Sequence, residues 1–229
     1  MVLVLFLLLT FIFSCKKQED AEVLDKDASY AFGMLMANQL NGQMGIMGLH
    51  FDYQAFMEGF RDYNEANETR LTQDQAYEKI VQAVNMLQAK EDEKLWLEGE
   101  RNREEGEAYM ELNGRRSEVV TTPSGLQYEV ILEGTGANPS LDDSVSVKYE
   151  GSLTNGTVFE STFANADPVE FTVGNVIEGW REGLQLMNEG SIFRFVIPEY
   201  LAYGSSANGP IPPSSTLIFV VQLFSINRQ

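Results

Sequence analysis

The sequence predicts an α+β protein: an all-α N-terminal part that ends in a long helix, followed by an antiparallel β-sheet wrapped on one short helix. Apolar residues recur at helical spacing from about residue 27 to residue 113. From Gly125 onward they alternate with polar residues, which is the period of half-buried strands. At 229 residues, 44% of them hydrophobic, the chain has the size and composition of two small globular domains.

An almost wholly apolar run, Val2 to Phe13, opens the chain. A helix needs about 20 apolar residues to span a bilayer, so this shorter run is typical of a signal-peptide core. Ile12-Phe13-Ser14-Cys15 then resembles a bacterial lipobox, whose cysteine becomes the lipidated N-terminus. We therefore expect residues 1–15 to be a lipoprotein signal peptide and a lipid on Cys15 to be the membrane anchor. No Lys or Arg precedes the run, so an uncleaved or unlipidated segment, or a start codon further upstream, is the alternative.

Residues 16–26 are polar and charged, as suits a flexible tether between the anchor and the folded part. A first helix is predicted from Tyr30 to about Asn41-Gly42, where the glycine would stop it. A second helix should begin after Asp52, a good N-cap, and end near Tyr63.

The third predicted helix is the longest. It starts at the capping box Thr72-Gln73-Asp74-Gln75, ends near Asn113-Gly114, and would be roughly 60 Å long at about 1.5 Å per residue. Its first part is amphipathic and should pack on the first two helices, whereas Glu98 to Glu107 is polar all round and predicts a rod through solvent. Gly99 and Gly106 weaken the helix by about 1 kcal/mol each relative to Ala and predict some bending.

Residues 27–116 are thus expected to form a helical domain with a stalk. Between residues 27 and 90 the three helices carry more apolar surface than so small a unit can bury, with a surplus of methionine at Met34, Met36, Met44, Met47 and Met57. The surplus favours a homodimer through residues 27–90. A self-contained helical bundle is the alternative.

Residues 117–229 are expected to form the sheet domain. Strands are predicted at 126–132, 145–149, 152–153, 158–159, 170–173, 191–197 and 216–226. Asn155-Gly156 predicts a type I′ hairpin turn, since both residues tolerate positive φ. A short helix from about Ile177 would place Trp180 and Leu184 on one face. Other aromatic residues of the strands belong in the core, namely Phe171, Phe193 and Phe195.

Six short segments carry a resemblance to a known family: Val147–Gly151, Gly156–Ser161, Val176–Trp180, Tyr200–Gly204, Gly209–Pro213 and Thr216–Phe219. In this order, over roughly residues 118–229, they resemble the FKBP-type peptidyl-prolyl isomerases, whose fold is an antiparallel twisted sheet wrapped on a short helix. The helix-rich N-terminal half, with Ser29–Gly33 and Thr122–Tyr128, resembles the bacterial Mip-like (macrophage infectivity potentiator) subgroup. In that subgroup the helical region is the dimerisation module.

The resemblance implies an enzyme that rotates X-Pro peptide bonds without a cofactor. It places the indole of Trp180 beneath the proline ring and assigns the Ile177 backbone N–H and the Tyr203 hydroxyl as donors to substrate carbonyls. The whole substrate pocket that it implies consists of Tyr149, Phe159, Glu160, Val176, Ile177, Trp180, Tyr203, Ile211 and Phe219.

Two positions depart from the family pattern. Glu160 stands where the family commonly has Asp, so its longer side chain could polarise the site or be a surface carboxylate. Val169 follows Pro168 where many members have phenylalanine, which leaves one wall less filled. These changes leave the catalytic rate and the inhibitor affinity open.

The charge of −18, without a basic stripe, argues against nucleic acid as a partner. His50 is the only histidine and Cys15 the only cysteine, so neither a metal site nor an internal disulfide is expected. The expected partners are proline-containing unfolded or flexible polypeptides, and the resemblance also implies macrolide inhibitors of the rapamycin type. The expected location is the bacterial cell envelope, lipid-anchored, at the periplasmic or outer-membrane face. The alternative function is a non-catalytic dimeric holdase chaperone with a degenerate isomerase domain.

Overall fold

The computed structural model describes residues 24–46 and 52–228, which divide into two units with the boundary between Ala76 and Tyr77. The predicted signal peptide, Cys15, most of the tether and His50 lie outside the described residues. Among the helices that the structure describes, none combines the length and the apolar character needed to cross a bilayer.

The first unit begins with α1 (Lys26–Ile46), which starts after Asp25, whose Oδ1 accepts a hydrogen bond from the Ala28 N–H at 2.7 Å. α1 continues beyond Asn41-Gly42, so the predicted end of this helix is wrong. A glycine ends a helix when it adopts positive φ, and Gly42 keeps a helical conformation without positive φ.

The caps predicted for the next two helices are confirmed. α2 (Tyr53–Asn64) starts at Asp52, whose side chain accepts from the Ala55 N–H at 3.0 Å. α3 (Gln73–Asn113) starts with both arms of the capping box: Gln75 N–H donates to Thr72 Oγ1 at 3.2 Å, and Thr72 N–H donates to Gln75 Oε1 at 3.0 Å.

The helices of the first unit leave their apolar side chains in solvent. No residue is buried in 24–45 or 52–76, the described side chains of that unit. Tyr30 is 71% exposed and Phe60 53% exposed. A self-contained bundle would bury such side chains, and the described part of this unit does not.

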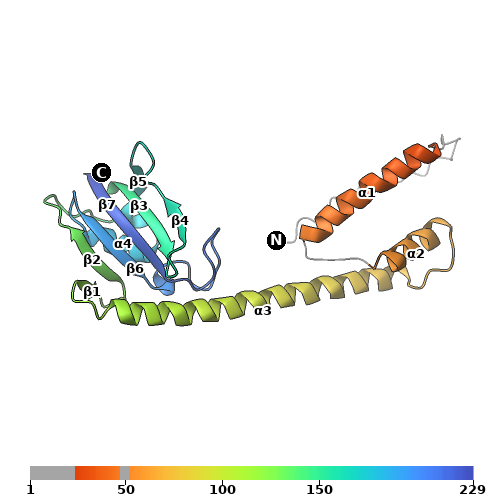
Figure 1. Cartoon of the computed structure of the whole chain (residues 1–229), viewed down its shortest axis with the longest axis horizontal. Coiled ribbons are helices and arrows are strands. Elements are labelled where there is room, and N and C mark those ends of the chain that lie inside the picture. Colours follow the sequence, from red (N-terminus) through yellow and green to blue (C-terminus); the bar gives the residue numbers. More distant parts are fainter. Residues whose placement is uncertain (1–23, 47–51, 229) are drawn as a thin grey trace. The chain divides into compact units, whose positions relative to one another are not determined.

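The second unit contains an antiparallel sheet with the strand order β1-β2-β6-β7-β3-β4, and β5 also pairs with β3 (Figure 1). The strands are β1 (Val119–Thr121), β2 (Gln127–Leu132), β3 (Ser144–Leu153), β4 (Val158–Ser161), β5 (Val169–Thr172), β6 (Ile192–Ile197) and β7 (Leu217–Asn227). The α+β class and the predicted strands are confirmed. β1 was not predicted, because three residues are too few to show alternation.

The turn between β3 and β4 differs from the predicted type I′ turn. Gly156 has φ +86°, whereas Asn155 does not have positive φ. The Gly156 N–H donates to the Leu153 carbonyl at 2.9 Å, which makes a type I turn followed by a left-handed glycine. The Asn155 side chain accepts from the Thr157 N–H at 2.9 Å and so stabilises this turn locally.

α4 (Glu178–Leu186) lies against one face of the sheet at unusually close range. A Cβ at Gly179 would lie 2.4 Å from Ile197 Cγ2, and one at Gly183 would lie 2.8 Å from Phe195 Cε1. Trp180 and Leu184, on the same helix, are both buried, as predicted. Two glycines on the sheet-facing side therefore set the distance between the helix and the sheet.

The polar segment of α3 is not a free rod, which corrects the prediction for Glu98 to Glu107. α3 continues unbroken through Gly99 and Gly106, and both glycines are buried against the segment before β7. A Cβ at Gly99 would lie 3.2 Å from Ser214 Oγ, and one at Gly106 would lie 2.3 Å from Thr216 Oγ1. The sequence pattern was misleading because this contact is made through hydrogen bonds between polar residues, so the helix carries no apolar stripe that would reveal it.

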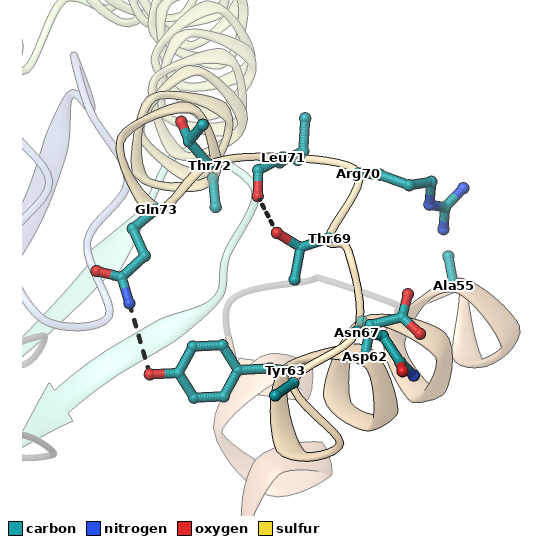
Figure 2. A pocket seen from close by; sticks show the side chains of 12 residues that line it. Ala55, Asp62, Tyr63, Asn67, Thr69, Arg70, Leu71, Thr72 and Gln73 are labelled. Atoms are coloured by element: carbon teal, nitrogen blue, oxygen red, sulfur yellow. Dashed lines mark hydrogen bonds between the residues drawn. The ribbon is translucent and has the colours of Figure 1, made fainter.

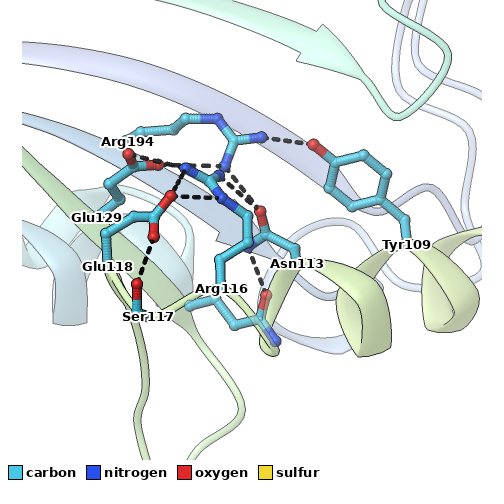
Figure 3. A network of polar contacts seen from close by, with 8 residues as sticks. Tyr109, Asn113, Arg116, Ser117, Glu118, Glu129 and Arg194 are labelled. Atoms are coloured by element: carbon cyan, nitrogen blue, oxygen red, sulfur yellow. Dashed lines mark hydrogen bonds and ion pairs between the residues drawn. The ribbon is translucent and has the colours of Figure 1, made fainter.

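Further along, the C-terminal end of α3 joins the sheet through a polar network (Figure 3). Arg194 of β6 donates to the Tyr109 hydroxyl and, at 3.1 Å, to Asn113 Oδ1. Asn113 is buried and donates to Gln127 Oε1 of β2 at 2.8 Å. Arg116 pairs with Glu129 at 3.0 Å. Because Asn113 and Gln127 are buried and satisfied, this end of α3 is part of the sheet domain's own structure.

The close contact at Gly106 predicts that Gly106→Ala destabilises the protein, by about 1–3 kcal/mol, through overpacking against Thr216. Equilibrium denaturation of the wild type, of Gly106→Ala, of Thr216→Ala and of the double variant measures this change in the free energy of unfolding. In the double variant, Thr216→Ala should recover part of the loss. An undocked helix would behave oppositely, because alanine is about 1 kcal/mol better than glycine in a free helix. A gain in stability for Gly106→Ala would therefore contradict the docking.

Candidate active site

Five aromatic rings gather around α4 in the sheet domain. The indole of Trp180 meets Tyr149 at 5.1 Å between ring centroids, Phe219 at 5.2 Å and Phe171 at 5.7 Å, with interplanar angles of 86°, 88° and 75°. Phe159 extends the cluster by meeting Phe219 at 5.7 Å. Edge-to-face pairs of this kind contribute about 0.5–1.5 kcal/mol each beyond their buried area. The indole is therefore held at steep angles against rings that come from three strands.

Tyr149 lies in the middle of β3, where its backbone is fastened to Thr162 just after β4. The Tyr149 N–H donates to Thr162 Oγ1 at 2.9 Å, and the Thr162 N–H donates to the Tyr149 carbonyl at 2.8 Å. Sequence reasoning missed Thr162, because a lone threonine after a strand carries no distinctive signal. These two bonds fix the height of the Tyr149 ring along the strand.

Glu160 is exposed, yet it reaches the site. Burial raises the pKa of Tyr149, and a hydrogen bond from its hydroxyl to the Glu160 carboxylate raises this pKa further. The longer side chain at this position therefore contacts a ring of the cluster. This contact favours the site role of Glu160 over that of a plain surface carboxylate.

Phe171 was expected in the core with Phe193 and Phe195. Those two residues are buried, and Phe171 is half-buried, packed against the core cluster with its ring close to Trp180 and Tyr149. Phe171 and Val169 are two residues apart on β5 and therefore share one face of the strand. A phenylalanine thus stands beside Val169, the position where this chain has valine and many family members have phenylalanine.

Val176 and Ile177 precede α4, and both are half-buried against the core. Ile177 is the N-cap residue of the helix, and its carbonyl accepts from the Arg181 N–H at 2.9 Å. Backbone N–H groups at a helix start have no partner within the helix. The Ile177 N–H also has no acceptor among the described residues, so it is free to donate to a ligand.

Tyr203 and Ile211 belong to the long segment between β6 and β7. Ile211 is buried in the core cluster, whereas Tyr203 is 37% exposed. Tyr203 also contributes, as the smallest influence, to the raised pKa of Tyr149, which places the two phenols near each other. Of the nine predicted pocket residues, seven thus lie in or against one core cluster, and the other two, Glu160 and Tyr203, lie near Tyr149 of that cluster.

The chemistry available at this cluster is apolar and non-covalent. Apart from Glu160, its members are aromatic or aliphatic. Its donors are the two tyrosine hydroxyls, the Ile177 backbone N–H and the Trp180 indole Nε1–H, which is buried without a hydrogen-bond partner among the described residues. Among the described residues, no group of three or more His, Cys, Asp and Glu side chains is placed to hold a metal. Such a site can bind and desolvate an apolar ring while orienting the carbonyls beside it.

A separate hollow of about 790 Å³ lies in the first unit, beside the turn between α2 and α3 (Figure 2). Its lining includes Asp62, Tyr63, Arg70 and Leu71, and none of its lining residues is buried. Thr69 donates to the Leu71 carbonyl at 2.8 Å at its rim. A catalytic site typically holds desolvated groups, and the lining of this hollow is open to solvent.

Comparison with known proteins identifies both parts of the chain. Residues 136–224 match the model of the FKBP-type peptidyl-prolyl cis-trans isomerases, and residues 25–130 match the model of the domain amino terminal to such isomerases.

Individual relatives extend over most of the chain. It is 41% identical to the probable FKBP-type peptidyl-prolyl cis-trans isomerase FkpA of Neisseria meningitidis, covering 88% of this chain and 74% of the relative. It is 37% identical to the outer membrane protein MIP of Legionella longbeachae, covering 89% and 87%. The crystal structure of FkpA from Escherichia coli superposes with a TM-score of 0.71 at 27% identity, over 91% of this chain and 99% of that chain. The chain therefore belongs to the FKBP-type peptidyl-prolyl cis-trans isomerases.

Proposed function

We propose that this isomerase acts in the bacterial cell envelope on proline-containing unfolded polypeptides, with the nine-residue cluster around Trp180 as its proline site. The main support for this site is the packing of the Trp180 indole, at steep angles, against the rings of Tyr149, Phe171 and Phe219. A flat apolar face in this setting suits the ring of a proline. One relative is named an outer membrane protein, which supports the envelope.

The reaction requires no nucleophile, acid or base from the protein. Rotation about a peptide bond has a barrier of about 18–20 kcal/mol, because conjugation between nitrogen and carbonyl is lost in the twisted state. No covalent bond is made or broken. A twisted amide is less dipolar than a planar one, so an apolar, water-poor site stabilises the transition state relative to the ground state.

The polar groups around the cluster hold the substrate chain. We expect the Ile177 N–H and the Tyr203 hydroxyl to donate to carbonyls on either side of the proline, as the resemblance implies. Glu160 orients the Tyr149 hydroxyl through their hydrogen bond. A chain gripped on both sides stays bent, which favours the twisted state over either planar isomer.

Replacing Trp180 should abolish most of the activity. We expect Trp180→Ala to lower kcat/KM for a short Xaa-Pro peptide at least about tenfold, or about 1.4 kcal/mol of transition-state stabilisation, because the proline ring loses its floor. Trp96→Ala is the matched control, since Trp96 is 62% exposed on α3 and should leave kcat/KM unchanged. Trp180→Phe, with circular dichroism, separates lost catalysis from lost folding.

The same proteins should be tested on a protein whose refolding is limited by proline. Wild-type protein should accelerate the slow phase, and a rapamycin-type macrolide should inhibit it. An unchanged slow phase with wild-type protein, together with equal behaviour of Trp180→Ala, would refute catalysis. A higher refolding yield at an unchanged rate would instead support the holdase alternative.

We further propose that residues 27–116 form a dimerisation domain with a stalk and residues 117–229 the isomerase domain. Support for a homodimer comes from the apolar side chains that one chain leaves exposed between residues 27 and 90, among them Tyr30, Phe32, Leu35, Phe60 and Tyr77, each at least 53% exposed. Exposed apolar surface on this scale marks a protein interface. Two linked catalytic domains would increase avidity for a client held by both.

The dimer proposal predicts a solution mass of two chains by light scattering. Phe60→Glu should lower that mass to one chain, because a carboxylate would be buried without a partner at the interface. Leu112→Glu is the control, since Leu112 is 64% exposed on α3 outside residues 27–90 and should leave the mass unchanged. A monomeric wild type, or an unaffected Phe60→Glu variant, would contradict the proposal.

Lipid anchoring at Cys15 completes the proposal and rests on the lipobox-like segment Ile12–Cys15. Expression of the full chain in a bacterium with a labelled fatty acid should label the protein and place it in the membrane fraction. The Cys15→Ser variant should carry no label and should no longer be found in the membrane fraction. A label that survives this substitution would show that the anchor is elsewhere.

A further inference from the structure

The segment from Glu199 to Thr216 carries two of the proposed site residues, Tyr203 and Ile211. Short backbone bonds close it upon itself: Gly204 N–H donates to the Glu199 carbonyl, and Ser214 N–H donates to the Gly204 carbonyl, both at 2.9 Å. Asn208 and Ile211 exchange two further backbone bonds at its tip. The segment, here called the site loop, is thus a small folded unit.

α3 fastens the site loop from outside. Asn102 Nδ2 donates to the Pro213 carbonyl at 2.9 Å. Arg103 reaches two points, because its Nε donates to Glu199 Oε1 and its Nη2 to Ser214 Oγ, both at 3.3 Å. Arg103 therefore ties the beginning of the site loop to its end.

The contact point on the loop is unusual. Ser214 has φ +54°, a left-handed conformation that non-glycine residues rarely adopt, and its side chain is 1% exposed. A backbone of this kind persists only where its surroundings hold it. Gly99 supplies the space for Ser214, Arg103 supplies its hydrogen-bond donor, and Ser214 N–H closes the loop at Gly204.

We propose that Asn102 and Arg103 of α3 are positioning residues for the isomerase site: by holding the site loop, they set the positions of Tyr203 and Ile211. Neither residue is among the predicted pocket residues, and both lie in the segment that the sequence predicted to be a free rod. The stalk helix is then a part of the catalytic unit, and its last turns support the proline site. The inference rests on the proposed roles of Tyr203 and Ile211.

Substitution of Arg103 in the full chain tests the proposal. We expect Arg103→Ala to lower kcat/KM for a short Xaa-Pro peptide about three- to tenfold, mainly through KM, because a loosened loop binds the peptide less well in all states. Arg103→Lys should recover only part of the activity, since one ammonium cannot span Glu199 and Ser214 as a guanidinium fork does. Arg115→Ala is the matched control, because Arg115 lies just after α3 with its side chain exposed, and its one ion pair within the described part of the chain is with the exposed Glu111.

Amide hydrogen exchange on the same variants supplies a local readout. In Arg103→Ala the hydrogen-bonded amides of Gly204, Asn208, Ile211 and Ser214 should exchange faster, while those of β6 and β7 keep their rates. Unchanged exchange at the four amides with kcat/KM within twofold of wild type would overturn the proposal. Equal acceleration throughout the domain would overturn it too, since Arg103 would then act on global stability alone.

Comparison of the Trp180 and Arg103 variants distinguishes a failure of the positioning role from a failure of the proposed proline site. Reduced activity in Trp180→Ala with full activity in Arg103→Ala would overturn only the role of α3. Full activity in Trp180→Ala would overturn the site, and the positioning role with it.

Discussion

The close approach of α4 to the sheet is the constraint on which the proline site depends. Gly179 and Gly183 face Ile197 and Phe195 at distances where any Cβ would overlap them. Because these glycines lie on the same helix as Trp180, the approach that they permit also sets the depth of the indole among the surrounding rings. Protein interiors are densely packed, so a helix displaced outward would separate the indole from these ring edges. The aromatic cluster around Trp180 thus depends on this close backbone contact.

A similar device joins α3 to the sheet domain. Gly99 and Gly106 bring that helix against the segment before β7, and Asn102 and Arg103 between them form hydrogen bonds across the contact. The buried pair Asn113 and Gln127 secures the last turn. Two helices, α4 and α3, are therefore joined to the sheet domain through glycines that allow close contact with the sheet or with its loops.

Much of the site was predictable, for a specific reason. Trp180, Tyr149, Phe159, Tyr203, Ile211 and Phe219 stand in short segments whose order resembles one family. The structure brings five of them together in or against the core cluster and places Tyr203 near Tyr149. Phe171 was assigned to the core because an aromatic residue in a strand usually packs there, and it does pack against the core, half-buried beside Trp180. Thr162 and Arg103 were missed because each acts on a residue distant in sequence, through bonds that no local pattern records.

The sequence by itself determined the class of the fold, the caps of α2 and α3, most strands and the family, because these follow from local periodicity, capping chemistry and ordered segments. Tertiary structure decided the rest. Asn41-Gly42 stayed helical, the β3–β4 turn became a type I turn with a left-handed glycine, and the polar part of α3 became a contact surface. In each case a residue compatible with several conformations or environments took the one that its surroundings stabilised. A glycine permits a turn, a helix break or a close contact equally well, and only the neighbouring chain selects among them.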